Sequence, residues 1–332
     1  MLYLECDVID LHVDSFIWTR AFGYDLCKRH GRGPFGGRLV SQVDLPRVRE
    51  AAIGGALWSI TTNPWREARA RARAFERNLA RLKTTLASVP DDVTLVDNAA
   101  SYRAAREAGK HGAFLAIQGG NALDADEHAI EALDDSGVIA VTLVHLSRSG
   151  LGQTNAPSGG TDEGLTEAGR RYVEALDQRR IFVDLAHIGR KGFFDAVQTH
   201  DRSLPLIVTH TGLSGVTPRW RNIDDEQLRA VAQTGGTVGI IFHGWYLGGG
   251  YWRGGSIDRI VDHALHVATT VGEDHVSLGS DWDGLIVGPA ALRTCLELPR
   301  LVQTMLDRGC SDTFVRKLLG GNFLRALALL RG

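Results

Sequence analysis

Residues 113–120 read AFLAIQGG, an apolar run that ends in an amide and two glycines. Five consecutive apolar residues followed by a turn signal are typical of a strand buried on both faces. Gln118 stands where this strand would open into a loop. Runs of the same character recur along the whole chain; the other seven are Val8–Val13, Gly55–Ile60, Val138–Val144, Ile181–Leu185, Leu206–Val208, Thr237–Phe242 and Val276–Leu278.

Helix-like segments separate most of these runs, and the alternation decides the fold class. Buried strands that alternate with helices predict a parallel sheet covered on both faces. Eight such units predict a (β/α)₈ barrel that spans residues 1–332 as a single domain, with a doubly wound sheet as the competing interpretation. The helix-like segments include Glu67–Leu86, Asp126–Leu133, Thr166–Arg179, Asp224–Gln233, Ile257–Thr270 and Ala291–Asp307.

The composition limits the classes of partner. The formal net charge is −2, which favours neither nucleic acid nor an anionic membrane as partner. We interpret the arginine-rich segment 66–83 as the solvated face of a helix and not as a nucleic-acid stripe. The four cysteines show no CxxC spacing, no signal peptide is recognisable, and no apolar run approaches the roughly 20 residues that span a bilayer. We therefore expect a cytoplasmic protein.

Polar side chains close seven of the eight predicted strands. In a barrel the carboxyl ends of the strands converge on one mouth, where active sites of this fold lie. Imidazoles mixed with carboxylates are the ligand set of zinc or a similar ion. These strand-end residues are His12 and Asp14, Gln118, His145, His187, His210, His243 and Asp281.

The other histidines need no functional role, and His243 has the weakest case among those at strand ends. We expect the others in helices or loops; they are His30, His111, His128, His200, His263, His266 and His275. The aromatic and glycine-rich stretch 244–255, GWYLGGGYWRGG, is typical of a mobile loop over a pocket.

With these residues placed, the chain resembles the membrane (renal) dipeptidase family, the zinc peptidases of family M19 in the amidohydrolase superfamily. The resemblance extends from about residue 8 to GGNFLRAL at 320–327. The motifs that carry it occur in order: His-x-Asp at 12–14, GLTEAGRRYVEAL at 164–176, VDLAH at 183–187, THTG at 209–212, RNIDDEQL at 221–228 and SDWDG at 280–284.

The resemblance implies a role for each matching residue. His12 and Asp14 would hold one zinc, and His187 and His210 the second. His145 would polarise the substrate, and Arg221 would grip its carboxylate. Asp281 would handle the protons of the bridging water. For Arg221 an ion pair with Asp224 or Asp225 is the competing interpretation.

Gln118 departs from the family pattern, because it matches the glutamate that bridges the two metals. An amide has one good ligating oxygen and no charge. Two unit charges 4 Å apart interact by about 4 kcal/mol at an effective dielectric near 20. We therefore expect one firmly bound zinc ion, with Gln118 as at most a ligand of one metal, and a weakened second site.

These observations predict a metal-dependent hydrolase that cleaves the amide bond of a dipeptide or dipeptide-like small molecule. Two alternatives stay open: an inactive member that binds a small peptide-like ligand, and an enzyme that processes an unusual amide in a specialised pathway. The expected partner is the small-molecule or dipeptide substrate, and a homodimer is left open.

Overall fold

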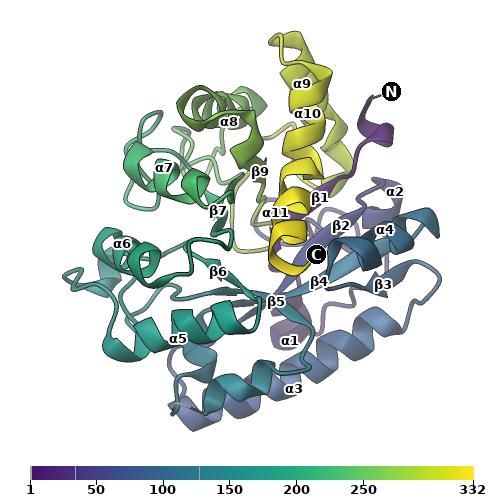
Figure 1. Ribbon diagram of the computed structural model, residues 1–332. Coiled ribbons are helices and arrows are strands. Elements are labelled where there is room, and N and C mark those ends of the chain that lie inside the picture. The colour runs from purple at the N-terminus through teal and green to yellow at the C-terminus, as the bar shows by residue number, and fades with distance from the viewer. Residues whose placement is uncertain (1, 34, 127) are drawn as a thin grey trace.

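Eight parallel strands close into a barrel in the computed structural model, which describes residues 2–33, 35–126 and 128–332 (Figure 1). β1 pairs with β2 on one side and with β9 on the other, which completes the ring. The predicted barrel is confirmed, each of the eight runs forms a strand, and the doubly wound alternative is wrong. In ring order the strands are β1 (Ile9–Val13), β2 (Gly55–Thr61), β4 (His111–Gln118), β5 (Val138–Thr142), β6 (Phe182–Asp184), β7 (Ile207–Thr211), β8 (Thr237–Ile240) and β9 (Val276–Leu278).

The register of the strands brings their polar ends to one level. β2 and β4 pair residue by residue up to Thr61 opposite Gln118. Gln118 in turn stands opposite Thr142 of β5, and Thr142 opposite Asp184 of β6. A row of polar side chains therefore crosses half of the barrel mouth.

An additional strand, β3 (Val93–Leu95), was not predicted. It pairs with the first residues of β4, from His111 to Ala113, whereas β5 pairs with β4 only from Leu115 onward. β3 thus occupies a stretch of β4 that the barrel leaves free, and only tertiary pairing makes these three residues a strand.

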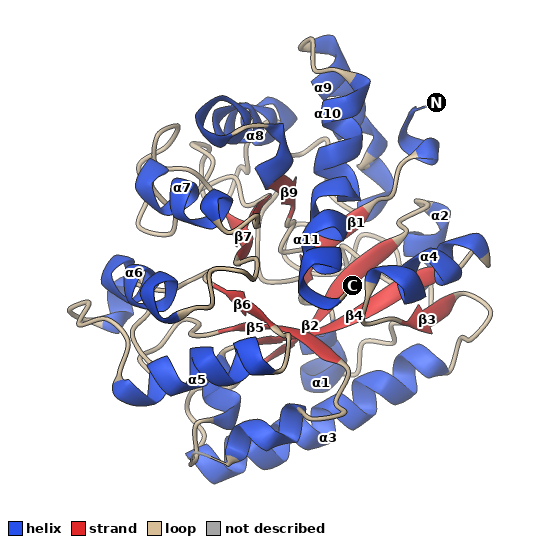
Figure 2. Cartoon of the chain, viewed as in Figure 1, coloured by secondary structure: helices blue, strands red, loops and turns tan. Residues whose placement is uncertain are grey.

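Helices surround the barrel, as Figure 2 shows. Thr166 caps α5 by accepting a hydrogen bond from the backbone N–H of Gly169, and Asp224 forms a capping box on α7. The longer helices of this layer are α3 (Ala68–Ala87), α4 (Ala99–Glu107), α5 (Glu167–Gln178), α6 (Arg190–Thr199), α7 (Asp225–Gln233), α8 (Ile257–Val271) and α9 (Pro299–Asp307), and α1 (Phe16–Phe22) and α2 (Leu45–Glu50) are shorter. Every helix in the described part of the chain is too short or too polar to traverse a bilayer.

The C-terminal helices cover the amino-terminal end of the barrel. Ser311 caps α10 (Asp312–Arg316), and a short π-helix, Lys317–Gly321, leads into α11 (Asn322–Arg331). The ring of Phe323 in α11 contacts the rings of Phe114 in β4 and Phe182 in β6. This end is therefore filled with apolar side chains, and the opposite end is free for chemistry.

Two predicted helices differ from the structure. The segment predicted as Asp126–Leu133 contains only the short 3₁₀ helix Ala129–Leu133, after another at Gly120–Leu123; residue 127 lies outside the described residues. The segment predicted as Ala291–Asp307 becomes an α-helix only at Pro299, because proline lacks the N–H that a helix interior requires and is placed at the first turn.

Candidate active site

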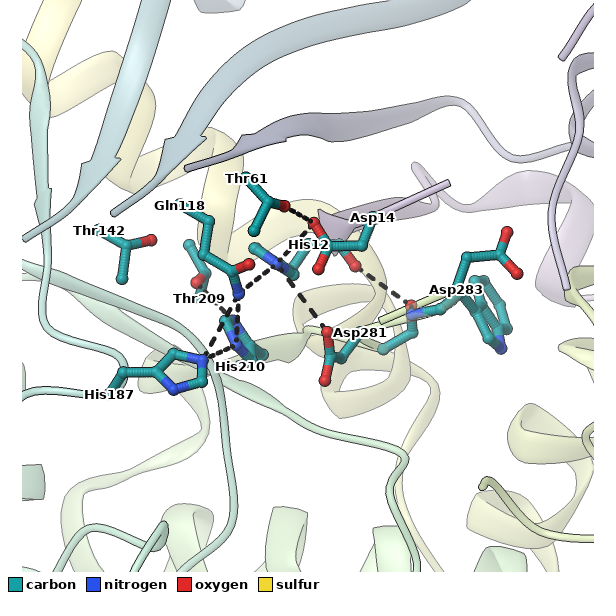
Figure 3. A network of polar contacts seen from close by, with 12 residues as sticks. His12, Asp14, Thr61, Gln118, Thr142, His187, Thr209, His210, Asp281 and Asp283 are labelled. Carbon is teal, nitrogen blue, oxygen red and sulfur yellow. Dashed lines mark hydrogen bonds and ion pairs between the residues drawn. The ribbon is translucent and has the colours of Figure 1, made fainter. Parts of the chain in front are cut away.

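Three imidazoles and one amide converge at the barrel mouth (Figure 3). The Nε2 atom of Gln118 lies 3.0 Å from Nε2 of His12 and 3.5 Å from Nε2 of both His187 and His210. The two Nε2 atoms of His187 and His210 are 2.8 Å apart. Four side chains from four strand ends therefore point their polar atoms at one spot.

Two carboxylates complete the cluster. Asp14 Oδ1 lies 3.6 Å and Asp281 Oδ1 3.9 Å from Nε2 of His12. The hydroxyl of Thr61 donates to Asp14 at 2.8 Å. Ligand atoms of His12, His210 and Asp281 all lie within 4.8 Å of one another, which is a spacing that suits a metal ion.

The backbone at two of these residues is strained. His187 has φ +67° and Asp281 has φ +63°, in the left-handed region that side chains with a Cβ adopt rarely. Such conformations cost of order 1–3 kcal/mol and cluster at functional sites, where the surrounding structure holds them. Both strained residues aim their side chains into the cluster (Figure 3).

Burial keeps two of the imidazoles neutral. It lowers the pKa of His187 and of His210 well below the usual value, with neighbouring cationic groups adding to the effect. Burial also works against charge on His12, but Asp14 and Asp281 outweigh it and raise its pKa. Neutral imidazoles offer the free lone pair that a metal requires.

A carboxylate behind the site sets the orientation of His210. Thr209 donates its hydroxyl to Asp184 Oδ2 at 2.6 Å, so its oxygen can only accept from Nδ1 of His210, 2.9 Å away. The proton of His210 is therefore on Nδ1, and the lone pair of Nε2 faces the site. Asp184 is held in turn by the hydroxyl of Thr142 at 2.5 Å.

The sequence interpretation did not assign Asp184 or Thr209 a role. Asp184 belongs to the VDLAH motif and Thr209 to the THTG motif, so the sequence signal for both is the motif that each shares with a candidate metal ligand. Their function as a support for His210 depends on the side-by-side placement of β6 and β7.

The donor set fits a metal. The Oε1 atom of Gln118 is buried and has no hydrogen-bond partner in the described residues. Rotation of the amide would direct this oxygen to the position its nitrogen now occupies, among three imidazole nitrogens. Nitrogen and oxygen donors of this kind are typical of zinc.

Arg221 is buried beside the cluster, and the competing ion pair is wrong. Its Nη2 donates to the backbone carbonyl of His210 at 2.6 Å, whereas Nη1 is buried without a partner in the described residues. Asp224 instead pairs with Arg190, and Asp225 with His266. Burial lowers the pKa of Arg221, as expected of a cation that lacks a carboxylate partner.

His145, just beyond the end of β5, lies beside the cluster and lines a cavity at the barrel mouth. The ring of His145 meets that of His187 edge-on, with centroids 4.6 Å apart, and loss of solvation lowers the pKa of His145 to about 4. His145 also lines a cavity of about 500 Å³, together with Thr61 and residues of α1 and of the loops after β2 and β5. We call it the mouth cavity.

The aromatic loop 244–255 packs on the Arg221 side. The amide of Asn222 donates to the carbonyl of Tyr246 at 2.8 Å, and Trp220 contacts the ring of Tyr246. The residues that line the mouth cavity come from other segments. The loop thus supports the segment that carries Arg221, and its mobility stays a prediction.

Two histidines outside the cluster have contacts typical of structural residues. Nδ1 of His243 accepts a hydrogen bond from the backbone N–H of Val287 at 3.3 Å. His111 was expected in a helix or loop, and this expectation is wrong: it is the first residue of β4. Its Nε2 accepts a hydrogen bond from Nε1 of Trp58, a fully buried side chain next to it.

A family model described as membrane dipeptidase (peptidase family M19) matches residues 1–330. Dipeptidase aclJ of Aspergillus oryzae is 26% identical, over 96% of this chain and 76% of that protein. Dipeptidase ataJ of Aspergillus terreus is 28% identical, over 87% and 76%.

Solved structures agree with this similarity. Dipeptidase AC, a metallopeptidase of family M19, has a TM-score of 0.88 and 26% identity, covering 98% of both chains. A metallopeptidase from Rhodobacter sphaeroides, solved with a phosphinate mimic of the dipeptide L-Ala-D-Ala, has a TM-score of 0.87 and 25% identity, covering 98% of this chain and 99% of that one.

Proposed function

This chain belongs to the membrane dipeptidase family, peptidase family M19, and is a dipeptidase-like hydrolase; we propose that it cleaves dipeptides at a zinc centre in the barrel mouth. The observation that carries the proposal is the convergence of His12, His187, His210 and Gln118 within 3.5 Å. The family implies a metal; zinc is the proposed ion because the donors are imidazoles and carboxylates.

The residues divide into two groups of ligands. His12 and Asp14 would hold the ion on one side, and His187 and His210 would hold an ion on the other. Gln118 would contribute its unpartnered oxygen to one of them. Because the amide adds no charge, we propose one firmly held zinc and a second site of lower affinity. When bound, zinc lowers the pKa of water to near neutrality and polarises a carbonyl group.

Asp281 is the proposed proton carrier. Burial raises its pKa well above the usual value, so this carboxylate readily accepts a proton. It would take a proton from the attacking water and return it to the leaving amine, as general base and then acid. His145, neutral at pH 7, would donate a hydrogen bond to the developing oxyanion.

Arg221 is the proposed anchor for the substrate carboxylate. Its unpartnered Nη1 supplies a donor beside the cluster, and a guanidinium binds a carboxylate through two parallel hydrogen bonds. A protein that only binds peptides, or one with altered chemistry, is not favoured, because the candidate ligands and Asp281 are all present together.

The test is dipeptide hydrolysis by the chain before and after chelation and zinc reconstitution, for wild type and Arg221→Lys. Lysine keeps the charge but loses the fork, so KM for a free dipeptide should rise about tenfold or more. A dipeptide amide should be affected little. Equal losses on both substrates would assign Arg221 a structural role, and absence of zinc-dependent hydrolysis of any dipeptide would refute the function.

We also propose one barrel domain over residues 1–332 and a cytoplasmic location. The single domain is supported by the barrel strands, which extend from Ile9 to Leu278, and by the helices that follow them and cover the barrel end. All four cysteines lie in described positions as free thiols, which supports a reducing compartment.

A further inference from the structure

A second cavity adjoins the mouth cavity on the β2 side of the barrel. It measures about 350 Å³ and lies between α1, α3 and the end of β2. Arg20, Thr61, Thr62 and Asn63 line both cavities, so the two are neighbours along one continuous wall. We call the second one the arginine cavity.

The mouth cavity offers an apolar wall to a ligand. Ile17, Pro64, Trp65 and Leu146 line it. Trp65 is 91% exposed and Leu146 is 47% exposed. Large apolar side chains exposed next to an active site gain most when a ligand covers them. An apolar stretch of the substrate is therefore the expected occupant.

The arginine cavity carries an excess of positive charge. Its arginines are Arg20, Arg66, Arg71, Arg77 and Arg81, and none of its lining residues is acidic. One of the five is compensated, because Arg71 pairs with Asp124 at 2.5 Å. The other four leave a net charge of +4 along one cavity (five arginines less the one that Asp124 neutralises).

The four uncompensated arginines keep unused N–H donors. Arg20 and Arg81 donate only to backbone carbonyls, those of Thr61 and Thr19. Arg66 and Arg77 form no side-chain hydrogen bond or ion pair within the described residues. Guanidinium groups gathered in this way repel one another unless an anion lies between them, and they are well suited to carboxylate or phosphate.

The direction from Arg221 to this cavity follows from the barrel order. Arg221 bonds to the end of β7, and Thr61 is the last residue of β2. β2 and β7 are four strands apart in either direction around the ring, so they face each other across the mouth. A dipeptide whose C-terminal carboxylate is held by Arg221 would thus direct its N-terminal residue toward β2.

We propose that the arginine cavity binds an anionic group at the end of the side chain of the N-terminal residue. The substrate class is then a dipeptide with a long N-terminal side chain, apolar along its length and ending in a carboxylate or phosphate. The apolar part covers the wall of Trp65 and Leu146, and the anion meets Arg66 and Arg77. This inference rests on the proposed function.

A matched pair of double variants tests the cavity. Arg66→Gln/Arg77→Gln removes two lining charges. Arg69→Gln/Arg73→Gln removes two charges from the same exposed stretch without touching the cavity lining. Binding of inorganic phosphate to the full chain, measured by titration calorimetry at low salt, should weaken about tenfold in the first variant and stay unchanged in the second.

Hydrolysis tests the substrate class. We compare 2-aminosuberyl-glycine, which has a long side chain ending in a carboxylate, with the same dipeptide carrying a terminal carboxamide. In wild type kcat/KM should favour the acid by about tenfold, the effect of roughly 1.4 kcal/mol. The preference should vanish in Arg66→Gln/Arg77→Gln and persist in Arg69→Gln/Arg73→Gln.

The outcomes separate this inference from the proposed function. Equal rates on acid and amide in wild type, or a preference that survives Arg66→Gln/Arg77→Gln, overturn the substrate class. Phosphate binding that is the same in wild type and both variants overturns the anion site. If no dipeptide is hydrolysed by any of the proteins, the proposed function fails, and the phosphate titration alone still decides whether the cavity binds an anion.

Discussion

At the scale of single residues, the amide of Gln118 has the strongest influence on the site. It lies between His12 on one side and His187 and His210 on the other, so the group at this position contacts both sets of ligand candidates. Its nitrogen faces them, and its buried oxygen has no partner among the described residues. A neutral side chain here lowers the electrostatic attraction for a second cation without removing any other ligand candidate.

Gln118→Glu should increase metal uptake from about one to about two equivalents of zinc and raise dipeptide turnover at least tenfold. The carboxylate restores one negative charge at almost the same shape, and two flanking cations compensate for its burial. Zinc should also raise the melting temperature of the variant more than that of wild type. Elemental analysis of identically reconstituted proteins measures the stoichiometry; equal zinc content would show that the amide does not set metal occupancy.

Thr209→Val should weaken zinc binding by about 10- to 100-fold, the range seen when a group behind a metal ligand is lost. Valine keeps the shape but cannot accept the Nδ1 proton of His210, so the ring is free to change tautomer. Thr209→Ser keeps the hydroxyl and should bind zinc as wild type does. Competition with a chelator gives the affinity, and ¹⁵N chemical shifts of His210 report the tautomer; unchanged shifts in Thr209→Val would exclude the relay from Asp184.

At the scale of elements, close packing of neighbouring strands determines where the side chains at their ends lie. A Cβ atom at Gly239 of β8 would collide with the carbonyl of Thr209 in β7 and would lie 3.1 Å from the Cα of Gly279, just beyond β9. Three adjacent strands therefore approach at a point where only hydrogen fits. This point is directly behind the residues that orient His210.

Gly239→Ala should lower the free energy of unfolding by about 1–3 kcal/mol, because the added methyl displaces backbone and not a flexible side chain. The displacement of Thr209 should weaken zinc binding as well. Gly31→Ala is the matched control, since a Cβ there meets no atom within 4 Å. Urea unfolding compares the three proteins. A stability of Gly239→Ala equal to wild type would mean that β7 and β8 adjust without cost.

At the scale of the whole molecule, the two ends of the barrel differ in the side chains that fill them. The carboxyl end holds the polar cluster, and the amino end is filled by α11 and by residues that start the strands. His111 belongs to this second end. Its Nδ1 donates to the carbonyl of Ile53 at 2.9 Å, its Nε2 accepts from Trp58 at 3.1 Å, and burial lowers its pKa to about 4.

Acidification should therefore destabilise the fold through His111. Its pKa when folded, about 4, lies below the unfolded value of 6.5, so its stabilising effect is complete above pH 6.5 and is lost as the pH falls toward 4. The full effect is of order 3 kcal/mol. His111→Gln, which keeps a donor and an acceptor, should show a smaller loss between pH 7 and pH 4.5. Urea unfolding of both metal-free proteins measures the free energy of unfolding at each pH. If it falls equally in wild type and variant as the pH is lowered, His111 is not the cause of the acid destabilisation.

Local patterns in the amino-acid sequence are enough to predict the barrel and most of the residues at its mouth. Runs such as Ala113–Ile117 are apolar on both faces, and a polar residue at the end of a parallel strand must lie at the mouth wherever the strand is placed. These are local properties, so eight strands and the residues from His12 to Asp281 could be predicted. The resemblance to a known family added their expected roles, which periodicity does not contain.

The neighbours of these residues, in contrast, depend on contacts between segments far apart in the chain. The relay from Asp184 through Thr209 to His210 depends on the pairing of β6 with β7, and β3 is a strand because β4 has a free edge. The 3₁₀ turns at Gly120–Leu123 and Ala129–Leu133 and the exclusion of an ion pair for Arg221 depend on packing in the same way. The cavities opposite Arg221 combine segments far apart in the chain. Such contacts are set by register and loop packing across the barrel, and no local pattern encodes them.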